Sequence, residues 1–195
     1  MSRRTKAERA AVGVSDHSGW SVLMTATSGG VLLDRRRIEL VDDGLPTMPH
    51  HHDGQKLPIE EAVALVERVR RSAEKNAEAR LAALAAELRV EIAGIALRAC
   101  PPLPDTIAER ITSYRAMCVA DWVMYRQALA KAATERGWAV RWYDPQRVFA
   151  DAAHALERDT IDDLLDEAKR RLGPPWQKDQ RMAMAAAIVA AHGKA

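Results

Sequence analysis

The acidic side chains that could take part in chemistry are scattered along this sequence. Asp16 follows an apolar run and precedes a turn-forming segment, and Asp179 precedes an Ala-rich stretch near the end of the chain. Glu61 and Asp121 lie in segments whose apolar residues recur with helical spacing. Hard divalent cations prefer oxygen ligands, so a fold that gathers these carboxylates would support metal-assisted chemistry.

Each of these carboxylates also has a structural interpretation. Asp16 fits an acid that caps a turn. Asp179 and Glu61 each fit a residue in the first turn of a helix, where a negative charge complements the helix dipole. Asp121 shares a helical stripe with apolar residues, so it fits an inward-facing acid paired with Arg110 or Arg115.

A second site-like segment is the loop 43–57, which contains three consecutive histidines, 50–52. Histidine is a common metal ligand, so a site built from this loop with His17 or Asp16 is one interpretation. The spacing matches no zinc signature, and a solvated loop is the other interpretation.

Cationic and aromatic residues add two more open interpretations. The runs 3–6 and 35–37 are basic, which suits phosphate contact or a charged strand edge. Trp138, Val140 and Trp142 alternate along one expected strand, which suits base stacking or packing in a core. The five tryptophans together favour core packing, because the rest of the expected core is built of Ala, Val and Leu.

Composition narrows the class of protein. The chain has 195 residues, 48% of them hydrophobic and 29% charged, which is typical of one soluble globular domain, 1–195, with residues 1–10 flexible. A net charge of +2 argues against a strongly basic nucleic-acid binder. No apolar run is long enough to span a membrane, and no secretory signal precedes the domain, so we expect a cytoplasmic protein with reduced Cys100 and Cys118.

The pattern of hydrophobic residues predicts an α/β protein. Strands are expected at 11–16, 20–26, 31–41, 90–97 and 138–143, and helices at 58–88, 117–136, 146–157, 160–172 and 177–191. A short helix with a Thr106–Glu109 capping box is expected between the fourth strand and the helix 117–136. Three meander strands followed by two helix-linked strands predict a mixed five-stranded sheet with helices on both faces.

This order of elements resembles the RNase H-like superfamily, and its details resemble the branch that contains the RuvC resolvases. The resemblance rests on three stretches: 12–20 (VGVSDHSGW), 142–148 (WYDPQRV) and 178–192, which begins with Lys-Asp and ends with His. It implies cleavage of phosphodiesters by two Mg²⁺ or Mn²⁺ ions held by clustered carboxylates. Asp16 and Asp179 would be ligands, with Glu61 or Asp121 supplying a third carboxylate.

The resemblance also marks departures from the family pattern. Aligned without gaps, the first family acid falls on Ser15, one residue before Asp16. The family has an acid at the end of the fourth strand, where this chain has Arg98. The family has a further acid in the last helix, where this chain has Met182.

Two functions follow from the sequence. One is a divalent-metal-dependent nuclease or resolvase-like enzyme acting on nucleic acid. The alternative is a catalytically degenerate RNase H-like domain that binds a partner, with the long helix 58–88 as an interface. Nucleic acid is the expected partner of the enzyme, and the helix 58–88 could also join two copies of the chain.

Overall fold

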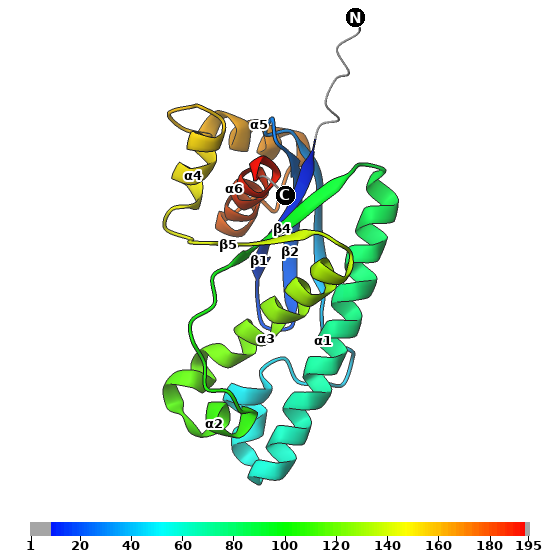
Figure 1. Cartoon of the computed structure of the whole chain (residues 1–195), viewed down its shortest axis with the longest axis vertical. Coiled ribbons are helices and arrows are strands. Elements are labelled where there is room, and N and C mark those ends of the chain that lie inside the picture. Colours follow the sequence, from blue (N-terminus) through cyan, green and yellow to red (C-terminus); the bar gives the residue numbers. More distant parts are fainter. Residues whose placement is uncertain (1–8, 194–195) are drawn as a thin grey trace, which may run out of the picture.

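A mixed five-stranded sheet forms the centre of the computed structural model, which describes residues 9–193 (Figure 1). The spatial order of the strands is β3-β2-β1-β4-β5. The β1, β2 and β3 strands pair antiparallel, whereas β4 pairs parallel to both β1 and β5. The strands are β1 (Ala10–Asp16), β2 (Trp20–Thr27), β3 (Leu32–Glu39), β4 (Ile92–Arg98) and β5 (Ala139–Tyr143). The predicted mixed five-stranded sheet is confirmed.

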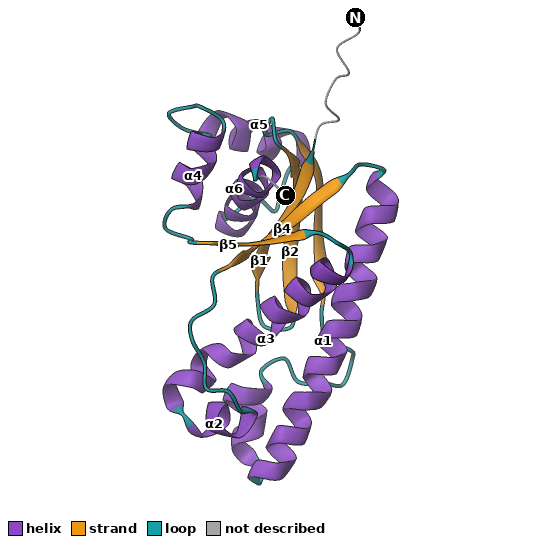
Figure 2. Cartoon of the chain, in the orientation of Figure 1, coloured by secondary structure: helices purple, strands orange, loops and turns teal. Residues whose placement is uncertain are grey.

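Helices pack on both faces of the sheet, and a helical lobe extends beyond one end (Figure 2). The helices are α1 (Ile59–Leu88), α2 (Ile107–Thr112), α3 (Tyr114–Glu135), α4 (Val148–Ala155), α5 (Asp162–Leu172) and α6 (Lys178–His192). A π-helical turn η1 (Pro49–Asp53) and a 3₁₀ turn η2 (Gly54–Lys56) occupy the loop that was expected at 43–57.

Two hydrophobic cores lie on opposite faces of the sheet. One joins the sheet to α1 and α3, and it includes Val12 and Val14 of β1. The other joins the sheet to α4, α5 and α6, and it includes Ala11 of β1. Successive residues of β1 therefore alternate between the two faces, as the pleat of a strand requires.

Gly13 sets how closely α6 approaches the sheet. A Cβ atom at Gly13 would lie 1.8 Å from the backbone oxygen of Ala183, so no larger residue fits while α6 keeps its place. The Ala-rich face of α6 continues this close contact. The first residues of α6, and with them Asp179, are thereby held against the carboxyl end of β1.

The predicted elements correspond closely to the observed ones. The Thr106–Glu109 capping box is present at the start of α2. The third strand ends at Glu39, two residues earlier than predicted, and α3 begins at Tyr114 because the Ser113 side chain accepts from the Ala116 amide and caps it. The expectation that all five tryptophans fill the cores is wrong, because Trp122 and Trp142 are exposed.

Three expectations are not settled by this architecture. The basic run 3–6 and most of the N-terminal segment 1–10 lie outside the described residues. The exposed face of α1 carries ion pairs of Arg70 with Glu67 and Glu74, and association of two chains through 58–88 stays a prediction.

Within residues 9–193, no helix combines the length and the apolar character that crossing a membrane requires.

Candidate functional site

The carboxyl ends of β1 and β4 meet at one edge of the sheet, because these neighbouring strands are parallel. In an open α/β sheet, this is the edge at which ligands commonly bind. Asp16 ends β1 and Arg98 ends β4. Three of the side chains that sequence reasoning singled out, Asp16, Asp179 and Arg98, gather around this edge.

Asp16 is bound by an arginine from α3. Both Nε and one terminal nitrogen of Arg126 lie 2.9 Å from Oδ2 of Asp16. The other terminal nitrogen of Arg126 donates to the backbone oxygen of Ala99 at 3.2 Å. The Asp16 side chain is only 2% exposed, so this is a buried ion pair. An arginine thus holds the carboxylate where the resemblance implies a metal ligand.

A second arginine lies beside the same carboxylate. The Nε atom of Arg98 lies 4.0 Å from Oδ1 of Asp16, and neither of these two buried atoms has a hydrogen-bond partner. The Arg98 side chain is 34% exposed, so its guanidinium reaches from the buried carboxylate toward the surface. The carboxylate therefore faces two cationic groups, one buried and one accessible.

Tyr143 and Cys100 lie close to this pair. The Tyr143 hydroxyl donates to the backbone oxygen of Val14 at 2.7 Å, and burial raises its pKa to about 12. Burial also raises the pKa of the Cys100 thiol, although the nearby Arg126 opposes that shift. Both groups are held protonated at neutral pH, so neither adds negative charge to the edge.

Asp179 lies on the opposite face of β1 and has different partners. The Ser15 hydroxyl donates to its Oδ1 at 3.2 Å, and Nε2 of His17 lies 3.2 Å from its Oδ2. The Asp179 side chain is 34% exposed. This carboxylate is therefore accessible to solvent, whereas Asp16 is not.

An aromatic stack fixes the position of His17. Its ring lies 3.7 Å from the Trp20 ring with an angle of 2° between the planes. The guanidinium carbon of Arg37 lies 3.8 Å from the Trp20 ring centroid. Such stacking restrains His17 beside Asp179 and places another cation near the same surface.

The register of β1 explains why Asp16 and Asp179 do not share a partner. The pairing of β1 with β2 runs without interruption from Ala10 to Asp16, so no bulge rotates Asp16 to the other face. Asp16 follows Val12 and Val14 toward α3, whereas Ser15 follows Gly13 toward α6. Ser15, rather than Asp16, therefore occupies the position on β1 that faces Asp179.

The other two predicted acids lie away from this edge. Glu61 is exposed in the first turn of α1, at the end of that helix farther from the sheet (Figure 1). Asp121 is buried in α3, as expected. Its expected pairing with Arg110 or Arg115 is wrong, because Arg110 instead donates to the backbone oxygens of Pro104 and Asp105, and Asp121 pairs with a histidine.

Asp121 holds the histidine loop in place. Its Oδ1 lies 2.8 Å from Nδ1 of the buried His50 and accepts from the His50 amide at 3.0 Å, while its Oδ2 accepts from the His51 amide at 3.1 Å. The carboxylate thus satisfies backbone donors at the start of η1, whose amides have no partner within the turn. Asp121 has a structural role that accounts for its burial.

Arg126 is the site residue that the sequence analysis missed. It lies within an otherwise apolar part of α3 and is buried with its neighbours Tyr125 and Leu129. A cation on the buried face of a helix requires an acidic partner, so an arginine among these apolar residues of α3 indicates a buried ion pair. The sequence does not say which of the chain's acids is that partner.

The residues at the edge do not fit a two-metal centre. Asp16 is bound by Arg126, and the oxygens of Asp179 contact Ser15 and His17. Within residues 9–193 there is no group of three or more Asp, Glu, His and Cys side chains placed to hold a metal ion. A site for two divalent cations needs several carboxylates around a shared space, whereas here Arg126 binds one carboxylate and the other lies on the opposite face of β1.

Comparison with known proteins supports the fold. No protein-family model and no curated protein matches the chain. Among solved structures, the chain is similar to T. thermophilus RuvC in complex with a Holliday junction substrate, with a TM-score of 0.53 and 14% identity over 94% of this chain and 93% of that one. A second Thermus thermophilus RuvC structure gives a TM-score of 0.49 with the same identity and coverage. The chain therefore has a RuvC-like fold.

Proposed function

We propose that this chain is a nucleic-acid-binding protein of RuvC-like fold that binds the phosphodiester backbone without metal-dependent cleavage. The observation that carries the proposal is the ion pair between Asp16 and Arg126, with Arg98 beside it. A guanidinium supplies positive charge and directed hydrogen-bond donors, which suit a phosphate oxygen. Arg126 neutralises the buried Asp16, so the partly exposed Arg98 guanidinium is left to offer a phosphate its positive charge.

The residues at the implied acid positions support this function over catalysis. Ser15 stands where the first acid is implied, Arg98 at the end of the fourth strand, and Met182 in the last helix. Asp179 alone keeps an accessible carboxylate. Replacing an acid by arginine at such a position removes a metal ligand and adds repulsion against a cation.

Cations at the edge are accessible to a ligand. Arg98 is partly exposed and has no hydrogen bond from its Nε. Arg37 is mostly exposed, stacks on Trp20 and pairs through its Nε with the equally exposed Glu39 at 2.7 Å. His17 stacks on the same Trp20 ring. Arg98 and Arg37 thus supply positive charge, and the His17–Trp20 stack supplies an aromatic element, which is the combination that nucleic-acid sites use.

A four-way DNA junction is the first ligand to test, since a structural neighbour was solved with a Holliday junction substrate. We expect the wild-type chain to bind a fluorescent junction in EDTA, measured by anisotropy, with an affinity that falls as salt rises. Arg98→Ala should weaken binding about fivefold, whereas Arg80→Ala, a control at an exposed arginine of α1, should not. Equal affinities for wild type and Arg98→Ala would remove this edge from the binding surface.

A metal-dependent nuclease is the second candidate, favoured by the accessible Asp179 with His17 beside it. In that function Asp179 would be a metal ligand and Asp16 would join it only after release from Arg126, whereas Glu61 and Asp121 lie away from this edge. Incubation of the junction with Mn²⁺ separates the candidates. We expect intact strands on a denaturing gel, and cleavage that disappears in Asp179→Asn would establish the nuclease instead.

A further inference from the structure

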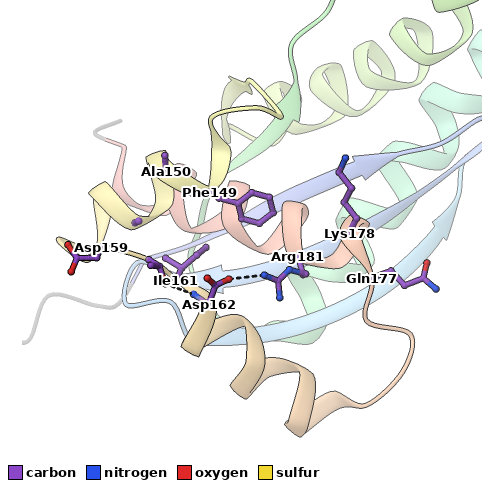
Figure 3. Close-up of a pocket in the computed structure, with 10 residues that line it drawn as sticks. Phe149, Ala150, Asp159, Ile161, Asp162, Gln177, Lys178 and Arg181 are labelled. Atoms are coloured by element: carbon purple, nitrogen blue, oxygen red, sulfur yellow. Dashed lines mark hydrogen bonds and ion pairs between the residues drawn. The ribbon is translucent and has the colours of Figure 1, made fainter.

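A cavity of about 510 Å³ lies between α4, α5 and α6 (Figure 3). This volume is within the range of small-ligand pockets. Three segments form its walls: α4, the α4–α5 loop with the first residue of α5, and the start of α6. The lining residues are Phe149, Ala150, Ala153, Asp159, Thr160, Ile161, Asp162, Gln177, Lys178 and Arg181. No residue of the edge described above lines it, so it is a separate site.

One side of the cavity is apolar. Phe149, the single phenylalanine of the chain, projects from α4 toward α6, and Ile161 lies across from it (Figure 3). Phe149 is only partly buried and packs its inner side against the core. It therefore offers part of an aromatic ring to the cavity, which is the surface against which a planar ligand stacks.

The other side is polar and fixed in place. A terminal nitrogen of Arg181 donates to Oδ1 of Asp162 at 2.8 Å (Figure 3). The other terminal nitrogen lies 3.8 Å from Oδ1 of Asp166. The Asp162 amide donates to the Thr160 hydroxyl at 3.2 Å. Arg181 contacts Oδ1 of Asp162, which leaves Oδ2 as an acceptor, so the wall offers both donors and an acceptor to the edge of a ligand.

Lys178 supplies an available positive charge. Among residues 9–193 it has no ion-pair or hydrogen-bond partner through its ammonium group, and its side chain is exposed at the first position of α6. In Figure 3 it projects away from the Arg181–Asp162 pair. Lys178 directly precedes Asp179, so a ligand that contacts this lysine lies close to the candidate nucleic-acid edge.

We propose that this cavity binds a nucleotide unit, with the base against Phe149 and the phosphate at Lys178. An aromatic wall, a polar wall with fixed donors and acceptor, and one free cation at the mouth match a planar heterocycle that carries an anionic group. This inference deepens the proposed function and rests on it for the source of the nucleotide, which would be an unpaired nucleotide of a bound strand. A free mononucleotide has the same chemistry and is the other source.

The test compares two variants with a control on the full chain. Phe149→Leu keeps an apolar side chain but removes the ring, and Lys178→Ala removes an exposed charge. Lys56→Ala is the control, since Lys56 is exposed, forms no ion pair with any of residues 9–193 and lies in η2 at the opposite end of the molecule (Figure 1). Anisotropy is measured in EDTA with a junction that carries one unpaired nucleotide and with a fully paired junction.

For the junction with the unpaired nucleotide, we expect Phe149→Leu and Lys178→Ala each to weaken binding roughly five- to tenfold. Phe149→Leu should leave the fully paired junction unaffected, and Lys56→Ala should leave both unaffected. Thermal melting with AMP, CMP, GMP and UMP forms the second arm, in which a rise in Tm that Phe149→Leu abolishes identifies a free-nucleotide site.

The outcomes separate this inference from the proposed function. If no junction binds but a mononucleotide raises Tm through Phe149, the proposed function fails and the nucleotide pocket stands. If both junctions bind wild type and Phe149→Leu equally and no mononucleotide raises Tm, the pocket is overturned while nucleic-acid binding stands. If neither junction nor mononucleotide binds, both proposals are overturned.

Discussion

Asp16 and Asp179 lie at the same edge of the sheet but differ in every property that decides function. Asp16 is buried and bound by Arg126, whereas Asp179 is one-third exposed and contacts Ser15 and His17. The difference arises from the pleat of β1, which directs neighbouring residues to opposite faces. Asp16 lies one residue beyond the expected ligand position. It therefore forms a core ion pair with Arg126 instead of a site shared with Asp179.

The largest effect is expected from breaking the buried pair. Arg126→Met should lower the free energy of unfolding by about 3–5 kcal/mol, because it leaves the Asp16 charge buried without its partner. Urea denaturation followed by tryptophan fluorescence measures the change. The double variant Asp16→Asn, Arg126→Met should recover much of the loss, since the uncompensated charge is then absent. A loss below about 1 kcal/mol in Arg126→Met would contradict a buried ion pair.

A second buried carboxylate extends the comparison to the far lobe. Asp121→Ala should cost about 2–3 kcal/mol, because the amides of His50 and His51 lose their acceptor in a buried environment. Hydrogen exchange should show faster exchange at these two amides than in the wild type. Unchanged protection at both would indicate that Asp121 does not hold η1.

The third prediction concerns the Tyr143 hydroxyl, which lies near Asp16 and is protonated at neutral pH. Tyr143→Phe should cost about 1 kcal/mol at neutral pH, because the hydrogen bond to the Val14 oxygen is lost. Burial raises the folded pKa to about 12, above the unfolded value of 10.0, so this group's stabilisation is complete below pH 10 and is lost as pH rises toward 12.

Stability of wild type and Tyr143→Phe measured from pH 9 to 12 checks the sign. The variant should lose less stability than the wild type across this range. Burial also raises the pKa of Tyr125, so some loss persists in the variant. A steeper loss in the variant than in the wild type would contradict the raised pKa.

The smallest effect on stability is expected at the exposed carboxylate. Asp179→Asn should change the free energy of unfolding by about 0.5 kcal/mol or less, since its contact with His17 is partly solvated. Asp16→Asn in the same urea assay should cost clearly more. Equal costs for the two substitutions would remove the contrast between buried and accessible acids.

Much of the fold follows from local sequence signals. The alternation of Trp20, Val22, Met24 and Ala26, and the Thr106–Glu109 capping box, each predict an element that the structure contains. These signals depend on residues close together in the chain, where periodicity and capping act.

The site depends on contacts between distant segments. Arg126 lies 110 positions from Asp16, and Asp179 lies 164 positions from Ser15, so neither pairing follows from spacing. The alternation of Asp16 with Val12 and Val14 predicts which face of the sheet Asp16 occupies, but it does not predict that Arg126 lies on that face. The sequence likewise marks His50 as a residue of the histidine loop. Its pairing with Asp121 depends on the packing of η1 against α3, which the sequence does not show.

A titration with Mn²⁺ tests most directly whether arginines have taken the place of metal ions at this edge. Thermal melting of the wild-type chain and of Asp179→Asn is recorded at increasing Mn²⁺ up to about 10 mM. We expect the Tm of the wild type to remain unchanged and the two proteins to respond alike. A rise in Tm with Mn²⁺ that is present in the wild type and absent in Asp179→Asn would show that the edge holds a metal ion and would contradict this account.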